Sequence, residues 1–331
     1  MMSEPIAVDI LTGFLGSGKT SMIRRLVEGG ALRETAILVN EFADLPVDGQ
    51  LIGLSGASAS IVGDRCLCCV TDGNLRAAII ALIEGQADGR TPSFRRILIE
   101  TSGIADPTPL IATLATDPIL KARVRLGRVV TLIDLCHGAT TLDESAEAMA
   151  QLIAADIVLL TKAELAEAGA AERLADRIGA VNPIARTFAA GGFDPFDRAL
   201  LPDQALPPRA ARAFMATPAA PRHDRIAASV LTTDAPVAWA RFAAWLSLLL
   251  HRHGDTILRI KGSVGIEMQD GPAAVVIQSV RHVVHKPEHV PADPGTSRTA
   301  LVVIARGLDH ERLAASFHRH VTTDKGVDIA Q

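Results

Sequence analysis

The chain has 331 residues and a mass of 34.9 kDa, which is enough for about two domains that each bury a core. Hydrophobic residues make up 48% and charged residues 21% of it, and no apolar run approaches the roughly 18 residues of a membrane span, so we expect a soluble protein without a membrane partner. The net charge of -4 argues against nucleic acid as a partner, and the N-terminus lacks an export signal, which indicates a cytoplasmic location.

Up to about residue 190, short β-branched apolar runs alternate with segments of helical periodicity, which is the pattern of βαβ units. The apolar runs are nearly continuous, as in strands that are covered on both faces. We therefore predict a first domain of the α/β class, over residues 1–192, with a doubly wound, mostly parallel sheet. Strands are expected at residues 6–11, 35–40, 96–100, 128–134, 156–160 and 184–188, and helices at 20–28, 74–84 and 143–155.

From residue 193 to 223 the chain is rich in Ala, Pro and Arg and has neither strand nor strong helix periodicity, so we expect a linker. A second, smaller α+β domain is predicted over residues 224–331. Its strands are expected at residues 228–232, 256–266, 273–284 and 298–306, and its helices at 237–252 and 308–320. Trp239 and Trp245 are expected in its core.

The segment GFLGSGKT at residues 13–20 fits the pattern G-x-x-x-x-G-K-[ST] and lies between a predicted strand and a predicted helix. Glycines let backbone N–H groups converge on phosphate oxygens, and the helix N-terminus adds a partial positive charge. We expect Lys19 to reach the β- and γ-phosphates and the Thr20 hydroxyl to ligate Mg²⁺. The predicted nucleoside-triphosphate site comprises Gly13, Gly16, Ser17, Gly18, Lys19, Thr20 and Ser21.

Polar residues follow several of the predicted strands, and ligands of doubly wound sheets bind beyond these carboxyl ends. Glu100 is expected to hold the Mg²⁺ or its water shell, which makes it the third predicted catalytic residue beside Lys19 and Thr20. The Gly103 N–H is expected to meet the γ-phosphate. For Asp134 we favour a role as a loop carboxylate or helix cap, and for Glu41 such a role is an open alternative to metal binding.

Thr161-Lys162-Ala163-Glu164 is similar to the [NT]KxD element by which GTPases read guanine. A carboxylate at the last position accepts hydrogen bonds from the guanine N1–H and amino group, and adenine offers no such pair of donors. Thr161, Lys162 and Glu164 are therefore predicted to bind the base. Glu164 is one methylene longer than the usual Asp, and a solvated Lys/Glu pair at a helix start is the alternative.

Three of the four cysteines lie together in Cys66-Leu67-Cys68-Cys69, a spacing suited to metal binding. Thiolates favour Zn²⁺ and Cu⁺, and Glu41 or Asp44 is expected to add a ligand. A redox thiol pair or buried small hydrophobes are the alternatives. Cys136, alone near a predicted strand end, is expected in the core.

These motifs together resemble those of the CobW-like metallochaperone GTPases, a family that includes the nitrile hydratase activators. The resemblance spans nearly the whole chain and rests on GFLGSGKT at 13–20, NEF at 40–42, CLCC at 66–69, ETSGIADP at 100–107, TKAE at 161–164, NP at 182–183, RIKG at 259–262, IQSVRHV at 277–283 and VVIARGLD at 302–309. It implies a P-loop GTPase domain, GTP binding with slow hydrolysis, Zn²⁺ or Co²⁺ at the CxCC thiols, and delivery of that metal to a client protein. The chain departs from the family pattern at Asp64-Arg65, where Asn-Gly is usual, and at Glu164.

We therefore expect a GTPase switch that is coupled to metal, with GTP and Mg²⁺ at the phosphate loop and Zn²⁺ or Co²⁺ at Cys66, Cys68 and Cys69. A client metalloprotein is the expected partner, and the sequence leaves undecided whether the chain forms a homodimer. One rival is a P-loop ATPase or small-molecule kinase whose cysteines are structural. Another is a non-enzymatic, metal-dependent regulator that binds nucleotide without useful turnover.

Overall fold

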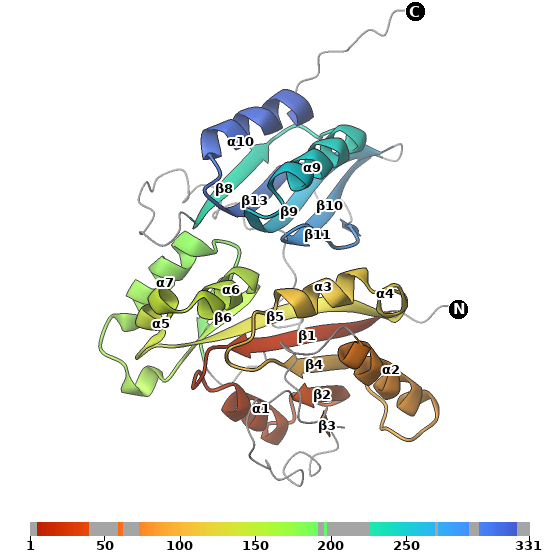
Figure 1. Cartoon of the computed structure of the whole chain (residues 1–331), viewed down its shortest axis with the longest axis vertical. Helices are drawn as coiled ribbons and strands as arrows, with labels where there is room; N and C mark the ends of the chain where they lie inside the picture. Colours follow the sequence, from red (N-terminus) through yellow and green to blue (C-terminus); the bar gives the residue numbers. More distant parts are fainter. Residues whose placement is uncertain are drawn as a thin grey trace, which may run out of the picture. The chain divides into compact units, whose positions relative to one another are not determined.

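The computed structural model describes residues 5–39, 59–61, 73–190, 195–196, 226–268, 271–290 and 298–322 (Figure 1). The chain divides into two compact units, Met1–Asp203 and Gln204–Gln331. The predicted linker at 193–223 lies outside the described residues except for 195 and 196, so the domain boundaries stay a prediction. No described helix is long and apolar enough to cross a membrane.

Within the described residues, the first unit has a seven-stranded sheet in which all neighbouring strands run parallel, and this confirms the predicted α/β class (Figure 1). The strands are β1 (Ile6–Gly13), β2 (Thr35–Val39), β3 (Ala59–Ile61), β4 (Arg96–Glu100), β5 (Val124–Asp134), β6 (Ile157–Thr161) and β7 (Arg186–Ala189), in the order β3-β2-β4-β1-β5-β6-β7. β1 lies between β4 and β5, where the order of the strands changes direction. Its carboxyl end is therefore the place at which a doubly wound sheet binds a ligand.

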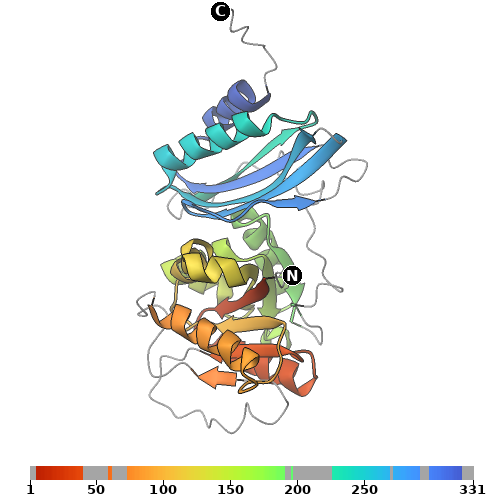
Figure 2. The same cartoon turned by 90° about the vertical axis from the view of Figure 1, so that its right-hand side faces the viewer.

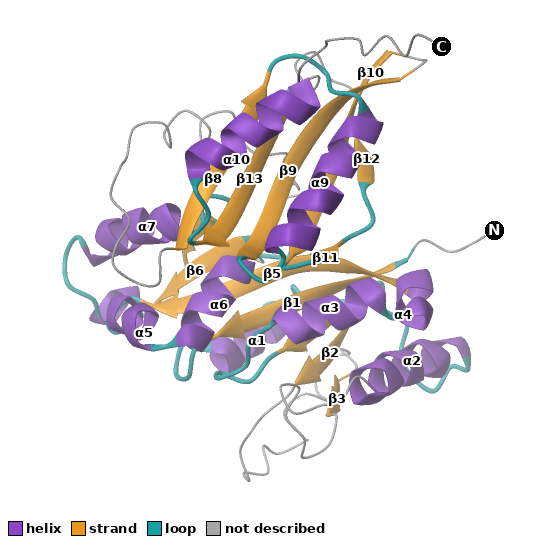
Figure 3. Cartoon of the chain, turned by 45° about the horizontal axis from the view of Figure 1, so that its top comes forward, coloured by secondary structure: helices purple, strands orange, loops and turns teal. Residues whose placement is uncertain are grey.

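Helices cover both faces of this sheet, with α1 on one face and α3 and α6 on the other (Figure 3). The helices of the first unit are α1 (Lys19–Glu28), α2 (Gly73–Ala87), α3 (Thr108–Thr116), α4 (Pro118–Arg123), α5 (Gly138–Glu144), α6 (Ala146–Ala154) and α7 (Ala170–Val181), with a 3-10 helix at Ala163–Leu165. Successive side chains of a strand point to opposite faces, and Ile10 and Leu11 of β1 are both fully buried. This two-sided burial explains why the strands read as continuous apolar runs.

The predicted helix at residues 143–155 is wrong as a single element, because two helices meet at Ser145. Ser145 has an extended backbone, and its hydroxyl accepts a hydrogen bond from the Ala148 N–H at 3.1 Å, which is the geometry of a helix N-cap. The sequence prediction also missed α3, α4 and α7, and it included only the last two residues of α5. Asp117 and Pro118 begin α4 as N-cap and first helical residue, a signal that predicts a helix start.

The second unit has, within the described residues, a six-stranded antiparallel sheet, and the predicted α+β class is confirmed. Its elements are β8 (Ile226–Thr233), α9 (Trp239–His253), β9 (Ile257–Met268), β10 (Gly271–Val280), β11 (Val283–Val284), β12 (Glu288–Val290), β13 (Thr299–Arg306), α10 (His310–Phe317) and a π-helical turn at His318–Thr322. The order is β11-β10-β9-β13-β8, and β12 pairs with β10. The predicted strand at 273–284 is broken by a turn at Arg281, whose φ is 50°.

Helices α9 and α10 lie on one face of this sheet and enclose the core with it (Figure 2). Phe242 and Phe317 are fully buried there, and Trp245 is buried as predicted. The prediction for Trp239 is wrong, because this side chain is 40% exposed at the first residue of α9. The rings of Trp245 and Phe317 meet edge to face with centroids 5.2 Å apart.

Replacing Phe317 by Ala should destabilise the second unit by about 3–5 kcal/mol, because the deletion leaves a cavity beside Trp245. Urea unfolding followed by tryptophan fluorescence measures this, since both tryptophans of the chain lie in the second unit. Leu248→Ala on α9 is the control, because Leu248 is 64% exposed and its loss should change stability by less than about 0.5 kcal/mol. Equal shifts in the two variants would contradict the assigned core.

Candidate functional site

The phosphate loop is the turn that joins β1 to α1, and glycines give it its shape. The backbone is in the left-handed region at Gly16 (φ 74°) and Gly18 (φ 94°), which side-chain-bearing residues rarely adopt. At Gly13 the constraint is also steric, because a Cβ there would lie 2.5 Å from the Leu132 carbonyl oxygen and 2.6 Å from the Ser17 hydroxyl. The predicted phosphate-site residues Gly13, Gly16, Ser17, Gly18, Lys19, Thr20 and Ser21 thus lie in one continuous turn from strand to helix.

Lys19 and the first turn of α1 make this loop attractive to anions. The Lys19 ammonium donates to the carbonyl oxygens of Gly13 (2.8 Å) and Phe14 (3.3 Å), which places the charge within the loop. The helix N-terminus has no side-chain cap and no acidic residue in its first turn. Its backbone N–H groups and the positive end of its dipole fit a phosphate group.

Two oxygen donors meet where the loop faces the neighbouring strand. The Thr20 hydroxyl donates to Glu100 Oε1 at 3.1 Å. Glu100 is 4% exposed and ends β4, and it lies beside Leu11 of β1 in the sheet register. A hydroxyl and a carboxylate are hard oxygen donors, so this pair fits Mg²⁺.

The segment that follows β4 packs directly on the phosphate loop. The Thr101 N–H donates to the Leu11 carbonyl (3.0 Å), and the Thr101 hydroxyl donates to that of Thr12 (2.7 Å). A Cβ at Gly103 would lie 2.8 Å from the Leu15 backbone nitrogen, so only glycine permits this approach. The structure therefore brings Gly103 against the phosphate loop, and its contact with a γ-phosphate stays a prediction.

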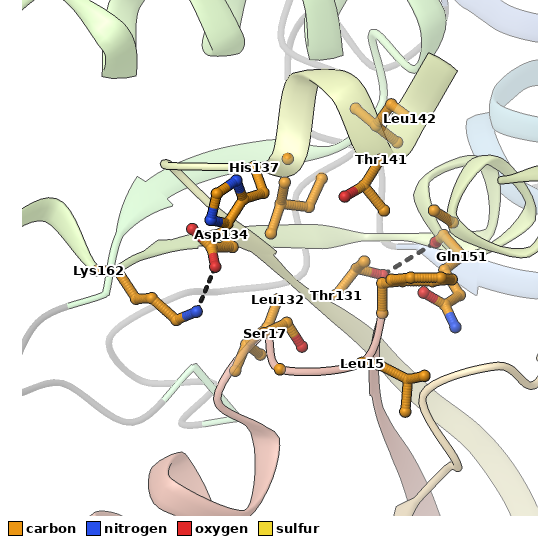
Figure 4. A pocket seen from close by; sticks show the side chains of 15 residues that line it. Leu15, Ser17, Thr131, Leu132, Asp134, His137, Thr141, Leu142, Gln151 and Lys162 are labelled. Atoms are coloured by element: carbon orange, nitrogen blue, oxygen red, sulfur yellow. Dashed lines mark hydrogen bonds and ion pairs between the residues drawn. The ribbon is translucent and has the colours of Figure 1, made fainter. Parts of the chain in front are cut away.

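The end of β6 holds the phosphate loop from the other side. The Thr161 hydroxyl donates to the Ser17 carbonyl at 2.9 Å. Lys162 has a left-handed backbone (φ 59°), and its ammonium forms an ion pair with Asp134 at the end of β5 (Figure 4). Glu164 is exposed in the 3-10 helix that follows. These positions bring Thr161 and Lys162 to the loop and leave the Glu164 carboxylate in solvent.

Asp134 is held in a turn, as the sequence predicted for a loop carboxylate. Its Oδ1 accepts a hydrogen bond from the Cys136 N–H at 2.7 Å. Partial burial raises the pKa of Asp134, but the hydrogen bonds from Lys162 and Cys136 and the charge of Lys162 outweigh it, so the net pKa is lowered. Cys136 itself is exposed, so its predicted place in the core is wrong. It lies in the turn after β5, where desolvation and the Asp134 carboxylate raise the pKa of its thiol.

A cavity of about 230 Å³ lies beside the phosphate loop, between the end of β5 and helices α5 and α6 (Figure 4). Leu15, Ser17, Thr131 and Gln151 are among the residues that line it. Gln151 donates from its side chain to the carbonyls of Gly103 (3.1 Å) and of the nearby Ala105 (3.0 Å). Sequence reasoning missed Gln151. The signal was a polar residue on the apolar face of a predicted helix.

The predicted metal ligands Glu41, Cys66, Cys68 and Cys69, and the alternative ligand Asp44, lie outside the described residues. Within the part of the chain that the structure describes, no three His, Cys, Asp or Glu side chains gather as a metal site would require. The metal site therefore stays a prediction.

Comparisons with known proteins agree with both units. The CobW/HypB/UreG nucleotide-binding domain matches residues 7–189, and the C-terminal domain of the cobalamin synthesis protein CobW matches residues 226–321. Zinc chaperone YjiA of Escherichia coli K12 is 29% identical over 95% of this chain and 98% of its own length. Zinc-regulated GTPase metalloprotein activator 1 of Schizosaccharomyces pombe is 34% identical over 55% of this chain and 45% of its own. The crystal structure of zinc-bound YjiA GTPase from E. coli superposes with a TM-score of 0.69 at 27% identity, covering 96% of this chain and 99% of that one.

Gly13→Ala should destabilise the first unit by at least about 2 kcal/mol, because the added Cβ overlaps the Leu132 carbonyl at a strained φ. Hydrogen exchange of the β1 amides measures the unfolding free energy of this unit. The matched control is Gly179→Ala in α7, where a Cβ meets no atom within 4 Å beyond its neighbours in the helix, so the alanine should raise stability slightly. A Gly13→Ala variant as stable as this control would show that the loop does not need the close approach.

Proposed function

The chain belongs to the CobW/HypB/UreG family, and we propose that it is a metal-chaperone GTPase that binds GTP, hydrolyses it slowly and delivers a metal ion to a client metalloprotein. The observation that carries the proposal is the glycine-built phosphate loop at the carboxyl end of the central strand, with Lys19 inside it. The names of its relatives, a zinc chaperone and a GTPase metalloprotein activator, support the same activity.

In this proposal the phosphate loop binds the phosphates of GTP. The backbone N–H groups at the start of α1 and the Lys19 ammonium bind phosphate oxygens, and Gly103 contacts the γ-phosphate from the neighbouring loop. Phosphoryl transfer needs chiefly positioning and neutralisation of negative charge, and these groups supply both. Lys19, Thr20 and Glu100 are therefore the proposed catalytic residues.

Thr20 and Glu100 are the proposed ligands of the Mg²⁺ that accompanies GTP. Their oxygen atoms already meet at 3.1 Å. Burying a carboxylate is costly unless cations or hydrogen-bond donors compensate it, so the buried position of Glu100 supports a cation site. When bound, Mg²⁺ neutralises charge on the phosphate oxygens.

Guanine is the proposed base, read by the segment after β6. Thr161 ties this segment to the phosphate loop through the Ser17 carbonyl, so the proposed base site is joined directly to the phosphate site. The stem of Lys162 covers one face of the base, and the exposed carboxylate of Glu164 accepts from the guanine N1–H and amino group. Glu164 has the freedom to fold back to this edge because it lies in solvent.

Zn²⁺ is the proposed cargo, with Co²⁺ as the alternative, at Cys66, Cys68 and Cys69 together with Glu41. Thiolates are soft ligands that favour Zn²⁺, and the zinc-bound structure of the relative YjiA supports this choice. Nucleotide and metal bias the same conformations in this proposal. Thermodynamic linkage then requires that each changes the affinity for the other by the same factor.

The nucleotide specificity is tested by competition of GTP and ATP against a fluorescent GDP analogue. GTP should compete much better than ATP, and Lys19→Ala should lower GTP affinity about 10- to 100-fold through loss of a charge-assisted contact. Arg24→Ala removes an exposed cation from the same helix and should leave GTP affinity unchanged. Equal competition by ATP would favour a P-loop ATPase or kinase, and wild-type GTP affinity in Lys19→Ala would refute the phosphate site.

The metal coupling is tested by measuring Zn²⁺ affinity with a competing chelator in the GDP-bound protein and in the protein bound to a non-hydrolysable GTP analogue. The two affinities should differ at least about fivefold, and the C66S/C68S/C69S variant should lose tight binding in both states. Cys136→Ser is the matched control, since it replaces the one cysteine outside the cluster and should bind Zn²⁺ as the wild type does. Equal affinity in the two nucleotide states would contradict the coupling.

A phosphate-release assay tests for hydrolysis itself. Absence of phosphate release both with and without Zn²⁺ would favour a non-enzymatic regulator.

A further inference from the structure

Gln151 of α6 binds the middle of the loop that joins β4 to α3. The side-chain nitrogen of Gln151 donates to the Gly103 carbonyl at 3.1 Å and to the Ala105 carbonyl at 3.0 Å. Carbonyl oxygens only accept hydrogen bonds, so the amide nitrogen and not the amide oxygen has to face them. Gln151 is 1% exposed, so water does not compete for these two bonds.

Gln151 is itself fixed to the sheet. The Thr131 hydroxyl of β5 donates to the backbone carbonyl of Gln151 at 2.9 Å (Figure 4). α6 also contacts β1, the strand that leads into the phosphate loop. The glutamine therefore reaches the loop from a helix that is tied to the two strands beside the site.

The bonds from Gln151 bracket the point at which this loop contacts the phosphate loop. The Ala105 N–H donates to the Ser102 carbonyl at 3.1 Å, which closes a turn with Gly103 near its tip. Gly103 lies against Leu15, closely enough that a Cβ would overlap it. Because two carbonyls of this turn accept hydrogen bonds from one buried amide of α6, the orientation of its peptide planes toward the phosphate loop is restricted.

We propose that Gln151 is a positioning residue that sets the affinity of the protein for GTP relative to GDP. The inference rests on the proposed function, in which Gly103 contacts the γ-phosphate that GDP lacks. Without Gln151, the turn has to lose conformational freedom when GTP binds. This loss of entropy lowers the affinity for GTP but not the affinity for GDP, because GDP has no γ-phosphate to order the turn. With Gln151 in place, the turn is ordered when the protein folds.

The test compares the affinities of the full-length protein for GDP and for a non-hydrolysable GTP analogue. Gln151→Met keeps the length of the side chain and removes both donated bonds. It should lower the ratio of GTP-analogue affinity to GDP affinity about tenfold, with GDP affinity unchanged. Gln151→Glu keeps the shape of the side chain and replaces the donor by an acceptor. It should also lower the ratio of GTP-analogue affinity to GDP affinity, and it replaces the Met variant in the test if that variant does not fold.

Asn182→Leu is the matched control for a general loss of stability. Asn182 is fully buried, and its side-chain amide donates to the carbonyl of Leu152 (2.8 Å), the residue after Gln151, and to that of Ala155 (3.0 Å), which follows the C-terminal end of α6. This variant should lower stability and leave the affinity ratio as in the wild type. The inference would be overturned if a folded Gln151 variant kept the wild-type ratio of GTP-analogue affinity to GDP affinity, or if Asn182→Leu lowered this ratio equally. Either result would leave the proposed function intact, because the wild type would still bind GTP. A wild type that binds no GTP analogue would overturn the proposed function and this inference with it.

Discussion

The contact between Gly13 and the Leu132 carbonyl is the constraint on which the nucleotide site depends. A side chain at position 13 would separate β1 from β5 at the point where the phosphate loop begins. With glycine there, the loop lies within reach of its neighbours on both sides. The Thr161 hydroxyl holds the Ser17 carbonyl from β6, and Gly103 packs on the loop from the β4 side. The loop is therefore shaped by close packing at Gly13 and Gly103 and by the hydrogen bond from Thr161, which together restrict the directions of its N–H groups.

The same arrangement places the chemically different parts of the site on different neighbours of β1. The oxygen donors of Thr20 and Glu100 meet on the β4 side. The ion pair of Asp134 and Lys162 joins the ends of β5 and β6. Because β1 lies between these strands, each group reaches the loop from its own side without crowding the others. A parallel sheet achieves this because all its carboxyl ends lie on one edge.

The two units bury their cores in different ways. The first unit covers both faces of a parallel sheet, so its strands are mostly apolar, with Asp9 of β1 and Arg128 of β5 as buried exceptions, and the polar residues of the site lie at strand ends. The second unit covers one face of an antiparallel sheet with α9 and α10, and Phe242, Trp245 and Phe317 fill the space between them. A nucleotide site at the carboxyl edge of a parallel sheet needs the first arrangement. The second unit has a core of its own.

The sequence by itself determined the fold class of both units and the position of the phosphate loop. These features depend on local patterns: continuous apolar runs, helical periodicity and a glycine-rich turn with Lys19 between a strand and a helix. It also placed Glu100 and Thr161 at strand ends, because strand boundaries can be read from the same patterns. Its predictions were wrong where one residue outweighs the pattern, as at Ser145, which ends one helix and caps the next.

Only the tertiary structure decided which of these strand ends are neighbours and what supports them. Gln151 and Gly103 are 48 residues apart, and their hydrogen bond exists because α6 packs beside the loop after β4. The ion pair of Lys162 with Asp134 likewise depends on the order of β5 and β6 in the sheet. Periodicity reports whether a position is buried, but not which partner it is buried against. That choice is made by the packing of elements that lie far apart in the chain.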